Sequence, residues 1–79
     1  MSIRADRLQA FGLPDCDAFE IEPRRYPTGL WGVAIACSGD PETIFTIGSA
    51  TKLADAVREI DPGLAQQIDE NVEKARRSS

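Results

Sequence analysis

The chain has 79 residues and contains no histidine. It also has only two cysteines, one tryptophan, one tyrosine and one methionine. The missing histidine removes the side chain that serves most often as a general base, as a neutral metal ligand and in nucleophilic triads. Two cysteines are too few for the dense disulfide framework of small secreted domains. We therefore expect a protein that is not an enzyme, that uses no cofactor and that binds no metal.

Long hydrophobic runs are also missing. No apolar stretch approaches the roughly 20 residues that a membrane span requires. Arg4, Asp6 and Arg7 lie where a signal peptide would have its apolar segment. The sequence therefore predicts a cytoplasmic protein without a membrane partner. In that compartment Cys16 and Cys37 are expected to be reduced.

Positive charge is in the minority. The chain carries nine lysines and arginines against 13 aspartates and glutamates, a formal net charge of -4. A negative field disfavours a nucleic-acid partner, whose phosphates it repels. Two arginine pairs, Arg24 with Arg25 and Arg76 with Arg77, have acidic residues nearby, a pattern typical of a solvated face. These four arginines are the candidate contacts of the alternative function, a small nucleic-acid-binding protein.

The most informative segment that is present is an uncharged run over residues 30–37. Large side chains occupy its odd positions and mostly small ones its even positions. In a strand, alternate side chains point to opposite faces of the sheet. One face would then carry Trp31, Val33, Ile35 and Cys37, and the other would carry Leu30, Gly32, Ala34 and Ala36. Neither face suits water, so both require a cover.

Two further strands flank this run in the sequence. Residues 18–25 alternate between apolar and polar side chains, and residues 43–47 are β-branched or aromatic throughout. Turn sequences at 26–29 and 38–42 join both segments to the central run. Short connections make neighbouring strands antiparallel, which predicts a three-stranded meander with residues 30–37 in the middle.

Helical patterns surround the three strands. A short helix at about 3–11 has Ser2 as its N-cap and Gly12 at its end. Two amphipathic helices follow the strands, at about 49–60 and 62–76. The sequence therefore predicts a single α+β domain over residues 1–79, with the last few residues frayed.

The two later helices have recognisable start signals. Ser49 or Thr51 can cap the first of them, and Asp61 followed by Pro62 can start the second. These helices are expected to pack on the sheet face that carries the larger side chains, with Trp31 at the centre of the core.

The sheet face with small side chains is the candidate interface. Its members are Leu30, Gly32, Ala34 and Ala36, with Ile44 beside them. An uncovered apolar face is unusual on a monomer and normally marks an interaction site. One cover is a protein partner or a second copy, and the other is the N-terminal helix through Leu8 and Phe11. We predict a small interaction or regulatory module that binds a protein partner or self-associates as a homodimer.

The order of elements suggests the alternative. The strand at 43–47 with its two later helices resembles the ribbon-helix-helix repressors, and three strands before a helix resemble small domains that read DNA with a sheet. The resemblance lies in element order alone and carries over no residue. It implies nucleic-acid binding as the competing expectation.

Overall fold

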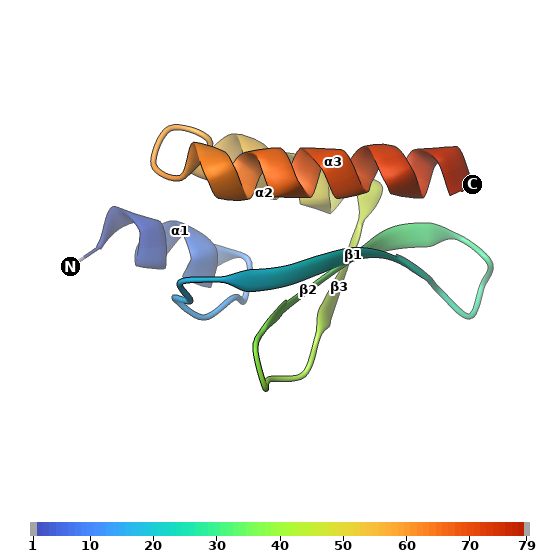
Figure 1. Cartoon of the computed structure of the whole chain (residues 1–79), viewed down its shortest axis with the longest axis horizontal. Coiled ribbons are helices and arrows are strands. Elements are labelled where there is room, and N and C mark those ends of the chain that lie inside the picture. The colour runs from blue at the N-terminus through green and yellow to red at the C-terminus, as the bar shows by residue number, and fades with distance from the viewer. Residues whose placement is uncertain (1, 79) are drawn as a thin grey trace.

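A computed structural model of the chain describes residues 2–78 (Figure 1). These residues form one antiparallel sheet in the order β1-β2-β3, together with three helices. The elements in chain order are α1 (Ile3–Ala10), β1 (Phe19–Arg25), β2 (Trp31–Cys37), β3 (Thr43–Thr46), α2 (Ile47–Val57) and α3 (Pro62–Ser78). The predicted α+β fold, with the uncharged strand in the middle of the sheet, is confirmed. Within residues 2–78 no helix has the length and apolar character that crossing a membrane requires.

The strand register divides the sheet into a large-residue face and a small-residue face. β2 pairs with β1 from Phe19↔Cys37 to Arg25↔Trp31. Directly opposed residues of antiparallel strands point to the same face. The face with large side chains therefore carries Phe19 and Ile21 from β1, Val33 and Ile35 from β2, and Phe45 from β3.

The helices α2 and α3 pack side by side over the large-residue face (Figure 1). The core between these layers excludes water, since Ile35, Leu53 and Ile68 are at most 1% exposed. Trp31 lies at the start of β2 and is only partly buried against this core. Its expected central position is therefore wrong, because it stands at the end of the strand where the helical layer covers it less fully.

The N-terminal helix α1 packs at one end of the fold, next to α2. It packs against α2, and Leu8 is fully buried in the core that the sheet and the later helices share. Phe11 packs against the same core, and the Arg7 guanidinium donates to the carbonyl oxygen of Ala56 at 2.5 Å. Leu8 and Phe11 therefore do not cover the small-residue face of the sheet.

The start and the end of α2 differ from the prediction. Ile47 is the first residue of α2 and not the last of a strand. The Thr46 hydroxyl oxygen accepts from the Ser49 N–H at 3.1 Å, so Thr46 is the N-cap and neither Ser49 nor Thr51 is. The helix ends at Val57, three residues before the predicted end. Because β3 leads directly into α2, no polar linker separates the two elements, and the sequence pattern does not mark the boundary between them.

The other helix signals are confirmed. Ser2 accepts from the Ala5 N–H at 3.3 Å, and Gly12 after α1 has a φ of 78°. Asp61 accepts from the Leu64 N–H at 3.1 Å at the start of α3. The capping residues therefore predicted the helix ends correctly where a polar residue or a glycine stands between two elements.

Cys16 and Cys37 form a disulfide, so the expected reduced state is wrong. The pairing of Phe19 with Cys37 brings the end of β2 beside the segment that leads into β1. The Cα atoms of the two cysteines lie 6.0 Å apart, a distance that a disulfide spans. The cytoplasmic location stays a prediction, without the support that two free thiols would have given it.

Candidate interaction surface

The candidate site is the sheet face that points away from the helices, called the outer face below. Strand pairing places on it Glu20, Glu22 and Arg24 from β1, Gly32, Ala34 and Ala36 from β2, and Ile44 and Thr46 from β3. It thus includes four of the five predicted interface residues. Leu30, the fifth, directly precedes β2, is 70% exposed and accepts the Tyr26 N–H on its carbonyl oxygen at 2.7 Å.

The small side chains of β2 leave a hollow in the outer face. Ala34 and Ala36 form its floor, Glu20 and Glu22 line it on the β1 side, and Glu42 lines it on the β3 side. Its volume is about 360 Å³. The sequence predicted the uncharged floor, and strand alternation placed Glu20 and Glu22 together on the solvated side of their strand. It did not place Glu42, which joins this face only through the turn into β3.

The Gly32 end of the outer face is filled by an aromatic ring. A Cβ atom at Gly32 would lie 2.3 Å from the carbonyl oxygen of Phe45 and 2.7 Å from Cε2 of Tyr26. The Tyr26 hydroxyl donates to the carbonyl oxygen of Ile44 at 3.3 Å. Tyr26 therefore lies against the middle strand at Gly32 and reaches the backbone of β3.

An ion pair crosses the middle of the outer face. The Arg24 guanidinium on β1 contacts Glu22 on the same strand and Glu42 before β3, the latter at 2.8 Å. Because β2 lies between β1 and β3, the Arg24–Glu42 pair spans the outer side of β2. These hydrogen bonds, that from Arg24 to Glu42 above all, raise the pKa of Arg24. Ala34 on the middle strand is only 2% exposed.

The second cover of the central strand is thus formed by polar side chains of the chain itself. Arg24 and Glu42 each keep 39% of their side-chain surface exposed. The Nε atom of Arg24 is nevertheless buried and has no hydrogen-bond partner among residues 2–78. A buried donor without an acceptor is rare in folded proteins. The polar cover of the central strand therefore leaves one buried donor, the Arg24 Nε–H, without an acceptor from any described residue.

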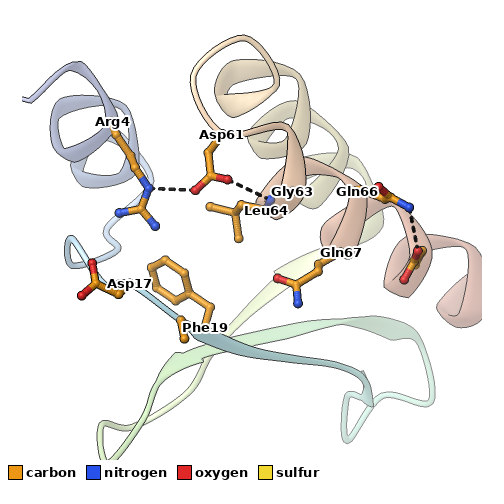
Figure 2. A pocket seen from close by; sticks show the side chains of 10 residues that line it. Arg4, Asp17, Phe19, Asp61, Gly63, Leu64, Gln66 and Gln67 are labelled. Atoms are coloured by element: carbon orange, nitrogen blue, oxygen red, sulfur yellow. Dashed lines mark hydrogen bonds and ion pairs between the residues drawn. The ribbon is translucent and has the colours of Figure 1, made fainter.

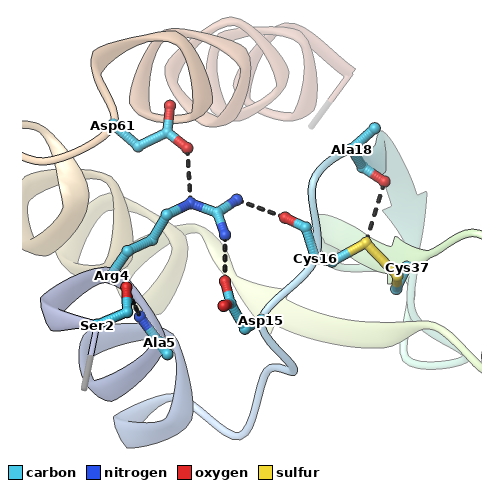
Figure 3. Close-up of polar contacts among 8 residues, drawn as sticks. All are labelled: Ser2, Arg4, Ala5, Asp15, Cys16, Ala18, Cys37 and Asp61. Carbon is cyan, nitrogen blue, oxygen red and sulfur yellow. Dashed lines mark hydrogen bonds and ion pairs between the residues drawn. A yellow bond between two sulfur atoms is a disulfide. The ribbon is translucent and has the colours of Figure 1, made fainter.

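A second hollow, of about 460 Å³, lies at the start of α3 (Figure 2). Arg4, Phe19, Asp61 and Gln67 are among its lining residues, and the Arg4 guanidinium is 6.0 Å from the centre of the Phe19 ring. The cation in this hollow is the Arg4 guanidinium, and its nitrogens already donate hydrogen bonds within the chain. The Nε atom of Arg4 donates to Asp61 at 2.9 Å, and its terminal nitrogens donate to Asp15 and to the carbonyl oxygen of Cys16 (Figure 3).

The Arg4 contacts join three parts of the fold. The hydrogen bond to Asp61 raises the pKa of Arg4, and the same bond lowers the pKa of Asp61, which caps α3. The bond to Cys16 lies next to the disulfide (Figure 3). This network ties α1 to α3 and to the segment before β1, so its role is structural.

The four candidate nucleic-acid contacts are distributed over several surfaces. Arg24 takes part in the ion pairs of the outer face. Arg25 belongs by register to the opposite face of the sheet and is exposed. Arg76 and Arg77 lie in the last turn of α3, where Arg77 is 3.7 Å from Glu73. Arg24 therefore does not share a face with the other three arginines.

Within the described part of the chain, residues 2–78, no three cysteine, aspartate or glutamate side chains are grouped to hold a metal ion. No protein-family model, curated protein sequence or solved structure matches the chain. Its own geometry is thus the basis for assigning a function.

Proposed function

We propose that the protein is a small non-enzymatic interaction module that docks a protein partner, or a second copy of itself, on its outer face. One observation carries this proposal. The helices α2 and α3 cover the opposite face of the sheet, and α1 packs against α2 with Leu8 in the same core, while the outer face keeps a hollow with an uncharged floor over its central strand.

The composition of the outer face supports docking. The hollow has the alanines Ala34 and Ala36 as its floor, Ile44 lies beside Ala34, and the carboxylates line the hollow. Protein interfaces commonly have an apolar centre and a polar rim. Leu30 adds a large exposed apolar side chain next to β2. Docking fits this face better than nucleic-acid binding, because two carboxylates engage Arg24 and acidic groups outnumber basic ones around the hollow.

A library of random displayed peptides, selected on the immobilised chain, tests the proposal. Ala36→Arg fills the hollow with a long side chain, and Ala10→Arg makes the same exchange at an exposed position of α1. The selected peptides should bind the unmodified chain and Ala10→Arg equally, and should lose at least about tenfold in affinity on Ala36→Arg, a difference of about 1.4 kcal/mol. Circular dichroism confirms that both variants fold.

Sedimentation over a range of concentrations tests the second copy. A dimer that Ala36→Arg dissociates, and that Ala10→Arg leaves intact, identifies the outer face as a self-association surface and supports the predicted homodimer. If peptide binding and molecular mass are both the same in the two variants, the outer face is not a docking surface and the proposal is wrong.

A further inference from the structure

Building on the proposed docking at the outer face, we infer that the partner is a separate protein that lays an extended segment carrying lysine or arginine into the hollow. A second copy of the chain fits this hollow poorly. The inference depends on the charges around the hollow, on the ion pairs that Arg24 makes with two of its lining carboxylates, and on its size.

The charges around the hollow are unbalanced. Glu20, Glu22 and Glu42 contribute three carboxylates, and Arg24 contributes the single guanidinium that contacts two of them. Within residues 2–78, Glu20 has no ion-pair partner. The hollow therefore presents excess negative charge beside an uncharged floor, which favours a cationic ligand.

The same imbalance opposes a second copy. Two outer faces in contact would bring the three carboxylates of each hollow together, and each chain carries a formal net charge of -4. Like charges at an interface are unfavourable and exclude unsuitable partners. A basic segment carries positive charge, so the carboxylates that repel a second copy attract such a partner.

Arg24 already acts as an internal cation in this position. Its guanidinium bridges Glu22 and Glu42, so one guanidinium can link these two carboxylates across the middle strand. It does so with a buried Nε atom that finds no acceptor in the part of the chain that the structure describes. A lysine or arginine of the partner can replace it between the carboxylates, and Arg24 can then turn into water, where its Nε atom is hydrated.

The size and the floor of the hollow favour an extended segment. A volume of about 360 Å³ accommodates side chains, whereas a helix with its side chains is about 10–12 Å across. The alanine floor lets a flat backbone approach β2 closely. Small and basic residues in an extended segment can then face the floor and the carboxylates in turn.

Two capped ten-residue peptides provide the test, one with alternating lysine and alanine and one with alternating glutamate and alanine. Each is titrated into the full-length chain, oxidised and labelled with ¹⁵N, and amide chemical shifts report the contact surface. The lysine peptide should shift amides around the hollow, in residues 20–22, 24, 34–36 and 42–44. Its binding should weaken as salt is added, because exposed charges are screened. The glutamate peptide should cause no such shifts.

Charge variants locate the effect. Glu20→Gln and Glu42→Gln should each weaken binding of the lysine peptide about threefold, and the double variant about tenfold. Glu73→Gln on α3 makes the same change in net charge away from the sheet and should leave the affinity unchanged. Arg24→Met removes the internal cation and should tighten binding several-fold. If Arg24→Met folds and weakens binding instead, replacement of Arg24 by the partner's cation is wrong.

The outcomes separate this inference from the proposed function. If library peptides still bind in an Ala36-dependent way while the lysine peptide does not bind, or binds no better than the glutamate peptide, docking stands and the basic partner is wrong. A dimer that Ala36→Arg dissociates supports self-association and contradicts a separate partner. An equal loss of affinity in Glu73→Gln shows attraction by net charge alone, and this also overturns the inference.

Discussion

Among single residues, Gly32 has the least room for change. A Cβ atom there would come within 2.3 Å of the Phe45 carbonyl oxygen, a backbone atom of the neighbouring strand. Gly32→Ala should therefore force β2 and β3 apart or displace Tyr26, and lower the free energy of unfolding by about 1–3 kcal/mol. Urea unfolding followed by the fluorescence of Trp31 measures the change.

Gly48 in α2 provides the matched control. A Cβ atom there has no neighbouring atom within 4 Å, and the residue is helical. Gly48→Ala should raise the free energy of unfolding by about 0.5–1 kcal/mol, because alanine favours the helix. If Gly32→Ala unfolds at the same urea concentration as the unmodified chain, the close packing of Tyr26 and β3 on this glycine is wrong.

The lowered pKa of Asp61 should make the free energy of unfolding depend on pH in the acidic range. The hydrogen bond from Arg4, above all, lowers the pKa of Asp61 below the usual aspartate value of 3.8, while burial opposes the shift. A carboxyl group whose pKa is lower in the folded than in the unfolded chain stabilises the fold above the unfolded pKa. That contribution is lost as the pH falls through the folded pKa. The free energy of unfolding should therefore decrease below about pH 4.

Asp61→Asn should remove part of this acid dependence, since asparagine does not titrate. Asp40→Asn in the exposed turn after β2 is the control for the change in net charge. Urea midpoints measured between neutral pH and pH 3 give the two slopes. An acid dependence in Asp61→Asn as steep as that of the unmodified chain would contradict the stabilising role of the Arg4–Asp61 pair.

Among the secondary-structure elements, α2 has a different N-cap from the one that the sequence predicted. Thr46 both ends β3 and caps α2, so its hydroxyl is the acceptor that the helix start requires. Thr46→Ala should lower the free energy of unfolding by about 1 kcal/mol. Ser49→Ala, which the sequence prediction would make equally costly, should change it by no more than a few tenths. Thermal unfolding of both variants tests this, and a larger loss in Ser49→Ala would refute the assignment.

For the whole molecule, the Cys16–Cys37 disulfide is the main covalent constraint. It links the segment after α1 to the end of β2 across a separation of 21 residues. In the loop-entropy model such a link contributes about 3 kcal/mol by restricting the unfolded chain. The double variant Cys16→Ala/Cys37→Ala should lose about that amount in urea unfolding.

Reduction should have the same effect on the unmodified chain and none on the double variant. Alkylation under native conditions without reductant provides an independent check, because a bonded pair takes up no reagent. Two labelled thiols in the freshly isolated, folded protein would show that the cysteines are not bonded.

Much of the architecture was predictable from the sequence, because local patterns determine it. The small residues of 30–37 required burial on both sides, and Asp61 with Pro62 marked a helix start correctly. Long-range features were not predictable. Nothing near Cys16 indicates its pairing with Cys37, and the hollow depends on Glu42 lying across β2 from Glu20 and Glu22, which only the folded sheet brings together. Gly32, Ala34 and Ala36 share a face because side chains alternate along β2, and Ile44 joins them through its pairing with Ala34.

The positions of β1 and β3 at the two margins of the sheet affect how the protein behaves when concentrated. Pro23 in β1 has no N–H to offer a further strand, and β3 is only four residues long. Both margins are thus poor templates for strand addition. We expect concentrated solutions to resist fibril growth, so any ordered assembly would form by stacking and not by lengthening the sheet.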